Sequence, residues 1–266
     1  MYEYTLRQWI FLFIFYCILG WILESTYVSV RTKKLTNRGF MRGPWLPIYG
    51  CGFVGMLLIS GPFRNNMLIL YIAGTIGGSV LELITGEAME AIFKVRYWDY
   101  SYRKYNFRGQ ICLPNSLYWG FLAIALNAFI QRYVELVLFA VPLRLMIIID
   151  SAVGAIIIVD FIKSVKSAID MMDILYQLDK AKNEMQILQK RLDVVIAVAS
   201  DGVKDEVDEL KIKAEVLKER IRGLSQIRDF DLREMIKGNP TMVSKKFQGA
   251  LDTIKETVYS RRNKEE

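Results

Sequence analysis

Long apolar runs dominate residues 9–162, and five of these runs are long enough to cross a lipid bilayer. A helix rises 1.5 Å per residue, so about 20 apolar residues span the hydrocarbon core. The runs cover residues 9–30, 45–63, 67–92, 111–130 and 143–162. Any one of these runs could be a buried helix of a soluble protein, but five such runs in one chain are poorly explained in that way. We therefore predict an all-α, polytopic membrane helix bundle of about five transmembrane helices.

Residues 134–142 are ambiguous in this pattern because they lie between the fourth and fifth runs. They fit an interfacial helix, and they also fit the tilted start of the fifth span. The first run lacks the basic segment that opens a secretory signal peptide, so we expect it to remain in the mature protein.

The pattern changes after residue 163, where isolated apolar residues alternate with charged ones. Apolar positions step by three and four over residues 178–199, break at the Ser-Asp-Gly of 200–202, and resume over 207–224. This spacing predicts two helices of coiled-coil type, either folded antiparallel as a hairpin or paired in parallel between chains. A last helix with lysines on its exposed side is expected at 243–259. The chain thus divides into two predicted parts: a transmembrane domain at 1–163 and a cytoplasmic helical tail at 164–266.

Lys and Arg gather in alternate loops of the predicted bundle. The first loop holds five of them between residues 31 and 42, and the third holds five between 94 and 108. The second and fourth loops offer Arg64 and Arg132. The positive-inside rule then places the N-terminus outside and the C-terminus in the cytoplasm. The net charge of +7 is explained by this topology and by attraction to anionic lipid, so we expect no nucleic-acid partner.

Two segments share an ordered set of residues, which predicts an internal duplication. Repeat A covers residues 9–63 and contains "GWILE", whereas repeat B covers 67–130 and contains "GSVLE". Each string precedes a basic loop with an Asn, an Arg-Gly pair, a proline and an aromatic-Gly pair. The matched positions are Asn37, Arg42, Gly43, Pro47, Tyr49 and Gly50 in one copy and Asn106, Arg108, Gly109, Pro114, Trp119 and Gly120 in the other. Both copies cross the membrane in the same sense, so they are predicted to be parallel repeats, with 143–162 as an additional span.

Each repeat carries a glutamate inside an apolar run, Glu24 in repeat A and Glu82 in repeat B. A charged residue in hydrocarbon costs about 2.5–3.5 kcal/mol on insertion scales and usually faces the bundle interior. We expect the two glutamates to face each other and to pair with Arg42 and Arg108. Glycine and proline beside these arginines would let the chain re-enter the membrane. The alternative is an ordinary cytoplasmic loop whose prolines begin the next helix.

Further acids follow Glu82 on the third predicted span. Glu90 lies on the same helical face as Glu82, which is consistent with an ion or substrate path. The alternative is that Glu87 and Glu90 are solvated at the headgroup level.

Four strings, "GWILES", "NRGFMRGPWLPIYG", "VLELITGEAMEAIFKVRYWDYS" and "NFRGQICLPNSLYWG", resemble the bacterial family of putative ABC-transporter type IV permeases over roughly residues 10–160. The resemblance implies a multi-pass protein of the bacterial cytoplasmic membrane and a permease function without a named substrate. Its characteristic positions would be Glu24, Asn37, Arg38, Gly39, Gly43, Pro47, Tyr49, Gly50, Glu82, Glu90, Trp98, Asp99, Tyr100, Asn106, Gly109 and Ser116. The chain departs from the pattern at Trp45-Leu46, where a smaller or more polar pair is expected.

Catalytic chemistry has little support in the sequence. The chain contains no histidine, which excludes His-based acid-base catalysis, Ser-His triads and His metal sites. It also lacks a Walker-type phosphate-binding motif, so an ABC permease of this kind needs a separate ATPase subunit, for which residues 96–107 are a candidate contact. We expect no enzymatic activity, catalytic residue, metal or cofactor. Four or five spans are few for a substrate pathway, so we expect a homo-oligomer.

Two functions remain open at this stage. One is a permease-like transport component of unknown substrate, with paired intramembrane glutamates and re-entrant arginine-glycine loops. The other is a membrane scaffold or regulator that anchors a cytoplasmic coiled coil without itself transporting anything. The candidate functional residues are Glu24, Asn37, Arg38, Arg42, Glu82, Glu90, Asp99, Asn106 and Arg108.

Overall fold

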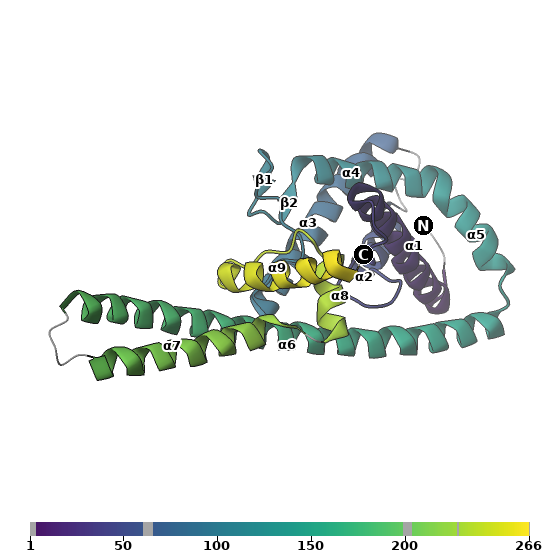
Figure 1. Cartoon of the computed structure of the whole chain (residues 1–266). Coiled ribbons are helices and arrows are strands. Elements are labelled where there is room, and N and C mark those ends of the chain that lie inside the picture. Colours follow the sequence, from purple (N-terminus) through teal and green to yellow (C-terminus); the bar gives the residue numbers. More distant parts are fainter. Residues whose placement is uncertain (1–3, 61–65, 199–203, 228, 266) are drawn as a thin grey trace.

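The computed structural model describes residues 4–60, 66–198, 204–227 and 229–265, and most of this part of the chain is helical (Figure 1). The loop with Arg64 and the Ser-Asp-Gly break at 200–202 lie outside the described residues. The helices are α1 (Leu6–Thr32), α2 (Pro47–Ser60), α3 (Met67–Phe93), α4 (Leu113–Ala125), the π-helical turn η2 (Leu126–Ile130), α5 (Gln131–Ala140), α6 (Leu143–Val198), α7 (Lys204–Ser225), α8 (Phe230–Gly238) and α9 (Gln248–Glu265). Two short antiparallel strands, β1 (Asn106–Phe107) and β2 (Ile111–Cys112), precede α4.

Among the described residues, four helical stretches are long and apolar enough to cross a membrane, which fits the predicted all-α polytopic membrane bundle. They are Leu6–Thr32, Met67–Phe93, Leu113–Ala140 and Leu143–Ala197. The second predicted span corresponds to the shorter α2, whose 14 residues rise about 21 Å against a hydrocarbon core of about 30 Å. A membrane crossing by residues 45–63 therefore stays a prediction.

Residues 134–140 of the ambiguous segment continue the fourth apolar helix, so the interpretation of this segment as the start of the fifth span is wrong. The chain runs without a break from α4 through η2 into α5. It then turns at Val141, which is extended (ψ 120°), because Pro142 disfavours helical geometry in the residue before it. Val134 and Leu138 are buried with α1 and α2 in one hydrophobic cluster, which draws this extension toward the bundle.

Glycines allow the helices of each predicted repeat to approach closely. A Cβ placed at Gly20 would lie 2.3 Å from the Tyr49 side chain, and one at Gly78 would lie 2.3 Å from the Trp119 side chain. The reciprocal contacts also correspond: Gly50 faces Phe13 and Cys17, and Gly120 faces Tyr71 and Thr75. Small residues at such positions permit the close packing on which helix association in membranes depends. The α1–α2 and α3–α4 pairs therefore approach closely at positions that correspond in the predicted repeats.

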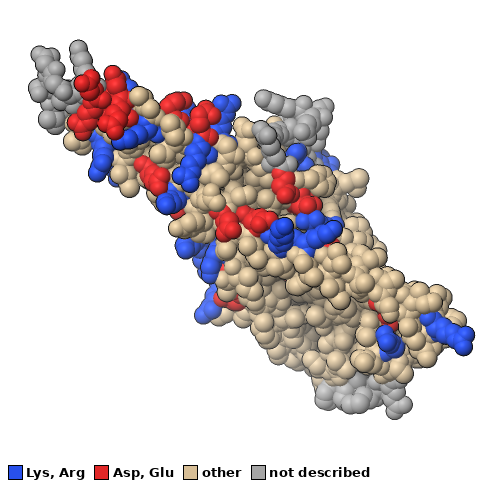
Figure 2. Space-filling model, turned by 90° about the horizontal axis from the view of Figure 1, so that it is seen from below, with Lys and Arg blue, Asp and Glu red and all other residues tan. Residues whose placement is uncertain are grey.

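The 56-residue helix α6 passes uninterrupted through residue 163, the predicted domain boundary. Its second half extends away from the bundle, and α7 returns along it as an antiparallel hairpin (Figure 1). Of the two arrangements left open by the sequence, the structure thus has the hairpin within one chain. Figure 2 shows charged side chains crowded on this extension and a broad uncharged surface beside it.

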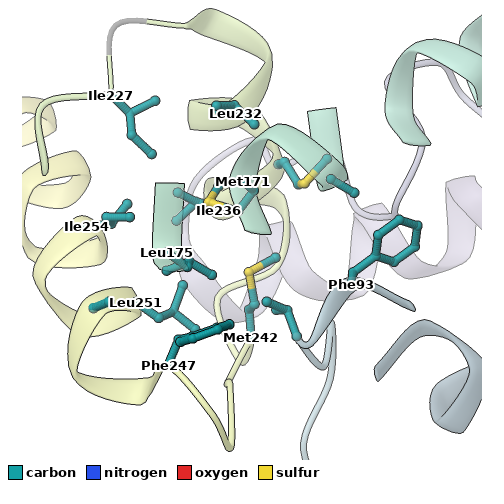
Figure 3. Close-up of a cluster of buried hydrophobic side chains, with 14 of the residues drawn as sticks. Phe93, Met171, Leu175, Ile227, Leu232, Ile236, Met242, Phe247, Leu251 and Ile254 are labelled. Carbon is teal, nitrogen blue, oxygen red and sulfur yellow. The ribbon is translucent and has the colours of Figure 1, made fainter. Parts of the chain in front are cut away.

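The end of the tail folds into a compact unit against α6 and the C-terminal end of α3. Side chains from α8 and α9, including Ile236, Leu251 and Ile254, are buried together with Leu175 of α6 and Phe93 of α3 (Figure 3). Sequence periodicity missed α8, which has only nine residues. The tail is therefore fastened to the membrane bundle.

The predicted start of the last helix, residue 243, is wrong by five residues. Val243 instead pairs with Arg96 in an isolated β-bridge, and the hydroxyl of Ser244 accepts a hydrogen bond from the Phe247 backbone. The prediction of exposed lysines also fails at Lys255. This side chain is partly buried and donates to the carbonyls of Pro240 and Met242, and its burial lowers the pKa of its amine.

The packing in Figure 3 predicts unequal effects of two truncations on α8. Ile236→Ala should lower the free energy of unfolding by about 2–5 kcal/mol, because Ile236 is fully buried and its truncation leaves a cavity. Phe230→Ala is the control, because this side chain is 70% exposed and should change stability by less than about 0.5 kcal/mol. Pulse proteolysis of the detergent-solubilised full chain measures both. Equal effects would contradict the docking of α8.

Candidate functional site

Glu82 is a buried carboxylate that accepts hydrogen bonds from uncharged donors. It lies on α3 and is 7% exposed. The indole nitrogen of Trp119 donates to one carboxylate oxygen at 3.3 Å, and the hydroxyl of Tyr100 donates to the other at 3.2 Å. The amide of Asn115 in turn donates to the Tyr100 hydroxyl. Within the described part of the chain, no Lys or Arg forms an ion pair with this carboxylate.

Glu24 has a corresponding donor on the helix that follows it. The hydroxyl of Tyr49 donates to a Glu24 oxygen at 2.7 Å. The Nε atom of Arg38 lies 4.0 Å from the other oxygen, and the Glu24 side chain is 32% exposed. Glu24 is thus more open than Glu82 and has a cation at the limit of ion-pair distance.

The two carboxylates belong to one cluster, because their donors touch. The rings of Tyr49 and Trp119 lie 5.3 Å apart between centroids. We call the set of Glu24, Tyr49, Glu82, Tyr100 and Trp119 the paired-glutamate site. Helices α1 to α4 each contribute one residue to it, and the loop after α3 contributes Tyr100.

Tyr100 closes this site from the loop side and remains protonated. Burial, followed by the nearby charges of Glu82 and Glu24, raises the pKa of Tyr100 well above its usual value. Its hydroxyl is therefore a permanent donor at neutral pH. A phenolate here would place a third negative charge beside two carboxylates.

The predicted pairing of Arg42 and Arg108 with the glutamates is wrong. Arg42 contacts Asp231 of α8 at 2.9 Å and donates to the hydroxyl of Ser167 on α6 at 2.7 Å. Arg108 lies 3.6 Å from Glu87, and its side chain is 63% exposed. Both guanidinium groups have acceptors outside the paired-glutamate site.

An acid on α6 holds the arginine-glycine turn of the first loop. A single carboxylate oxygen of Asp160 accepts from the Gly43 backbone at 2.9 Å and from the Trp45 indole at 2.7 Å. Trp45, where the family pattern suggests a smaller or more polar residue, is therefore buried against α6 with its polar atom satisfied.

Asn37 and Arg38 shape the same loop in different ways. The side chain of Asn37 accepts from the Trp21 indole at 2.6 Å and donates to the Arg42 carbonyl at 2.6 Å. Arg38 reaches the tail, where it donates to the Gly238 carbonyl at 3.2 Å and to the side-chain oxygen of Asn239 at 2.7 Å. Asn37 thus folds the loop, and Arg38 fastens it to the tail.

Glu90 and Asp99 belong to a second cluster, which is centred on Arg96. This guanidinium is 3% exposed, lies 2.6 Å from Glu90 and lies 3.3 Å from Asp99. Gln110 and Lys245 also contact Glu90, at 2.9 Å and 3.2 Å. The expectation that Glu90 is solvated is therefore wrong, and its ion pairs explain its position better than a path from Glu82.

Asn106 stabilises the hairpin that follows this cluster. Its side chain accepts from the Gly109 backbone at 3.0 Å and donates to the Arg103 carbonyl at 2.6 Å. Gly109 has φ +72°, a conformation that glycine adopts without the strain of a Cβ. The role of Asn106 visible here is to shape this turn.

One segment of the tail, residues 231–245, binds both loops, and we call it the docking segment. The side chain of Asn239 donates to the Gly39 carbonyl of the first loop at 2.9 Å. Val243 exchanges two backbone hydrogen bonds with Arg96 of the other loop, at 2.8 Å and 3.0 Å. The hydroxyl of Ser244 adds a bond to the Lys94 carbonyl at 2.7 Å. The two loops are thus joined through the tail.

Sequence reasoning missed several residues that complete these clusters. Tyr49 and Trp119 stood at matched positions of the predicted repeats, and this correspondence was a signal that they share a role. Asp160 and Asn239 had no comparable signal, because their partners are distant in the chain. Arg96 was counted only among the basic residues of its loop, although its partners Glu90 and Asp99 are close to it in sequence. No group of three or more Cys, Asp or Glu residues suited to a metal ion occurs among the residues that the structure describes.

The geometry around Glu82 predicts different outcomes for two substitutions. Glu82→Leu removes the acceptor of Trp119 and Tyr100, so it should lower the free energy of unfolding by about 2–6 kcal/mol, at about 1–3 kcal/mol for each stranded donor. Glu82→Gln keeps an acceptor oxygen and should retain most of the stability. Denaturant titration in detergent measures this difference, with Glu87→Leu on the same helix as the exposed control. Equal losses in both Glu82 variants would contradict the donor assignment.

The contacts of the docking segment differ in burial, and we therefore expect different stability costs when a buried contact and a partly exposed contact are removed. Asn239 is 1% exposed, so Asn239→Ala should cost about 1–3 kcal/mol by stranding the Gly39 carbonyl and Arg38. Asp231→Ala removes an ion pair whose side chains are both 34% exposed, so its cost should stay below about 1 kcal/mol. Amide hydrogen exchange over residues 37–43 of the full chain distinguishes the two. Unchanged protection in the Asn239 variant would exclude the tail as the support of this loop.

Comparison with known proteins identifies one family. Neither a curated protein nor a solved structure matches the chain. The sequence model of the family described as "Putative ABC-transporter type IV" matches residues 11–165, more than half of the chain. The matched region holds both glutamates, both basic loops and the first part of α6. The resemblance read from the sequence is therefore confirmed, and the chain belongs to the putative ABC-transporter type IV family.

Proposed function

We propose that this chain is a permease-like transport subunit whose paired-glutamate site lies on the transport route. The observation that carries the proposal is that Glu82 is buried in an apolar bundle without a cationic partner among the described residues. Ionisable groups at such positions are costly, and they often mark substrate, ion or proton pathways. A purely structural role would be served as well by an uncharged acceptor.

The charge balance of the site supports a positively charged or proton-carrying species. Two carboxylates meet three neutral donors, Tyr49, Trp119 and Tyr100. The nearest guanidinium, that of Arg38, is 4.0 Å from Glu24 and also binds the tail. With both carboxylates ionised, the site carries excess negative charge, which a bound cation or proton would offset.

We also propose that the two halves of the bundle arose by duplication. The contacts of Gly20 with Tyr49 and of Gly78 with Trp119 support this proposal, because each pair joins equivalent positions of the two copies. Each copy then contributes a glutamate and its aromatic donor to a shared site. A bundle of this size fits best as part of a larger assembly, formed with further copies or with a separate ATPase subunit.

The tail limits where an ATPase could bind, because it covers parts of both loops. Arg38 and Arg96 are covered by the docking segment, with side chains 15% and 3% exposed. A cytoplasmic partner therefore meets the α6–α7 hairpin and the α8–α9 unit before it meets these arginines. In this arrangement the tail transmits force to both loops, and through Tyr100 to Glu82.

The alternative is a membrane scaffold or regulator, and the same docking segment favours it. The bonds of Asn239 and Val243 to the two loops hold the tail in a defined orientation. A bundle that serves only to present this tail needs no transport route. In that case the glutamates contribute to helix association alone.

One purification distinguishes the two functions. The transport proposal predicts that an ATPase co-purifies after mild extraction from native membranes, and that Glu82→Gln lowers its phosphate release by about tenfold or more, equivalent to at least about 1.4 kcal/mol. Glu87→Gln is the control and should leave the rate unchanged.

The outcomes separate cleanly. Absence of an ATPase, or unchanged phosphate release in the Glu82 variant, would count against a transport route through this site. Loss of the co-purified protein in the Asn239→Ala variant, together with unchanged phosphate release in the Glu82→Gln variant, would support the scaffold function.

A further inference from the structure

The hairpin between α3 and α4 presents aromatic and basic side chains side by side. Tyr102, Tyr105 and Phe107 are 62%, 63% and 53% exposed. Each has a cation over its ring: Arg103 lies 5.1 Å from the Tyr102 centroid, Lys104 lies 5.5 Å from Tyr105, and Arg108 lies 5.6 Å from Phe107. We call residues 102–108 the aromatic-basic hairpin.

The outward charge of this hairpin is positive because the nearest loop acid is directed inward. Asp99 accepts from Ser101 at 2.7 Å and contacts the buried Arg96. Glu87 pairs with Arg108, whereas Arg103 and Lys104 form no ion pair with an acid among the described residues. An anionic partner would therefore find two uncompensated cations.

The hairpin lies at the ends of two membrane helices. α3 ends at Phe93 and α4 begins at Leu113, so the hairpin is placed where these helices leave the hydrocarbon. Neighbouring surface residues are apolar: Ile92, Leu113 and Tyr118 are 60%, 50% and 64% exposed. In Figure 1 the hairpin points away from α6 and α7, to the side of the bundle. This surface is continuous with the lipid-facing surface.

The backbone of the hairpin is held in place before any partner arrives. The Leu113 N–H donates to the Tyr105 carbonyl at 2.9 Å, and the Tyr100 N–H donates to the Gly109 carbonyl at 2.8 Å. Asn106 closes the turn between the strands. Little backbone freedom is therefore lost on binding, which lowers the entropic cost of association.

We propose that the aromatic-basic hairpin binds anionic phospholipid headgroups of the adjoining leaflet. The aromatic rings lie at the interface, where Tyr and Trp are enriched in membrane proteins, and Arg103, Lys104 and Arg108 contact the phosphates. The sequence alone suggested an ATPase contact for residues 96–107. The lateral position of the hairpin and its apolar neighbours favour lipid.

A depth measurement on the full chain in nanodiscs tests this proposal. A nitroxide is attached at Tyr105→Cys in a Cys51→Ala background, because Cys17 and Cys112 are buried. In phosphatidylglycerol-containing discs, we expect the label to be more accessible to oxygen than to a water-soluble nickel chelate. Each cation removed in Arg103→Gln, Lys104→Gln and Arg108→Gln should lower the ratio of inserted to aqueous label by about fivefold.

The matched control removes three lysines of α7. Lys211→Gln, Lys213→Gln and Lys218→Gln cause the same loss of charge on an exposed helix of the tail and should leave the label depth unchanged. Repeating the measurement with the label at Tyr102→Cys checks that the loss of one ring does not decide the result.

Three results would overturn the proposal. One is an aqueous label in anionic discs, and another is an equal depth in discs of phosphatidylcholine alone. The third is a label that becomes shielded only when a co-purified protein is bound, which would assign the hairpin to a protein partner.

Discussion

A carboxylate buried in an apolar bundle must find hydrogen-bond donors, and this requirement organises α1 to α4. Glu82 obtains its donors from Trp119 on the neighbouring helix and from Tyr100 on the loop. The indole reaches the carboxylate because Gly78, one turn before Glu82, leaves room for the Trp119 ring. Loss of the Glu82 carboxylate, or of the space beside Gly78, would leave polar groups without hydrogen-bond partners in a medium without water. The helix pairing and the polar site are therefore one structural feature.

The same requirement extends into the loops and the tail. The guanidinium of Arg96 is buried with two acids, and Asn239 is buried with a loop carbonyl. Buried polar groups of this kind specify one arrangement strongly, because every misaligned alternative strands a charge or a donor. The loops after α1 and α3 therefore depend on residues more than a hundred positions further along the chain. Membrane bundle and tail form one folded unit, and the predicted boundary at residue 163 falls inside a continuous helix.

Much of the fold could be read from local patterns. Apolar length predicted the membrane helices, and the three-four spacing predicted the two long helices of the tail, whose arrangement it left open between two alternatives. The glutamates were identified because a charge inside an apolar run is costly. Arg42 and Arg108 were assigned to the glutamates because the glycine and proline residues beside them were expected to return the chain to the membrane. In the structure these arginines contact Asp231 and Glu87 instead. The short helix α8 was missed because its nine residues give too little periodicity.

The sequence by itself thus determined the class of protein, the apolar helices, the two acids inside apolar runs and the family, because hydrophobicity and motif spacing are local properties of the chain. Tertiary structure alone decided which donors meet those acids, which loop each arginine fastens, and that the tail docks on both loops. These outcomes depend on contacts such as Tyr49 with Trp119 and Arg38 with Asn239. Such contacts join residues far apart in sequence, and their energies arise only once water is excluded between the helices.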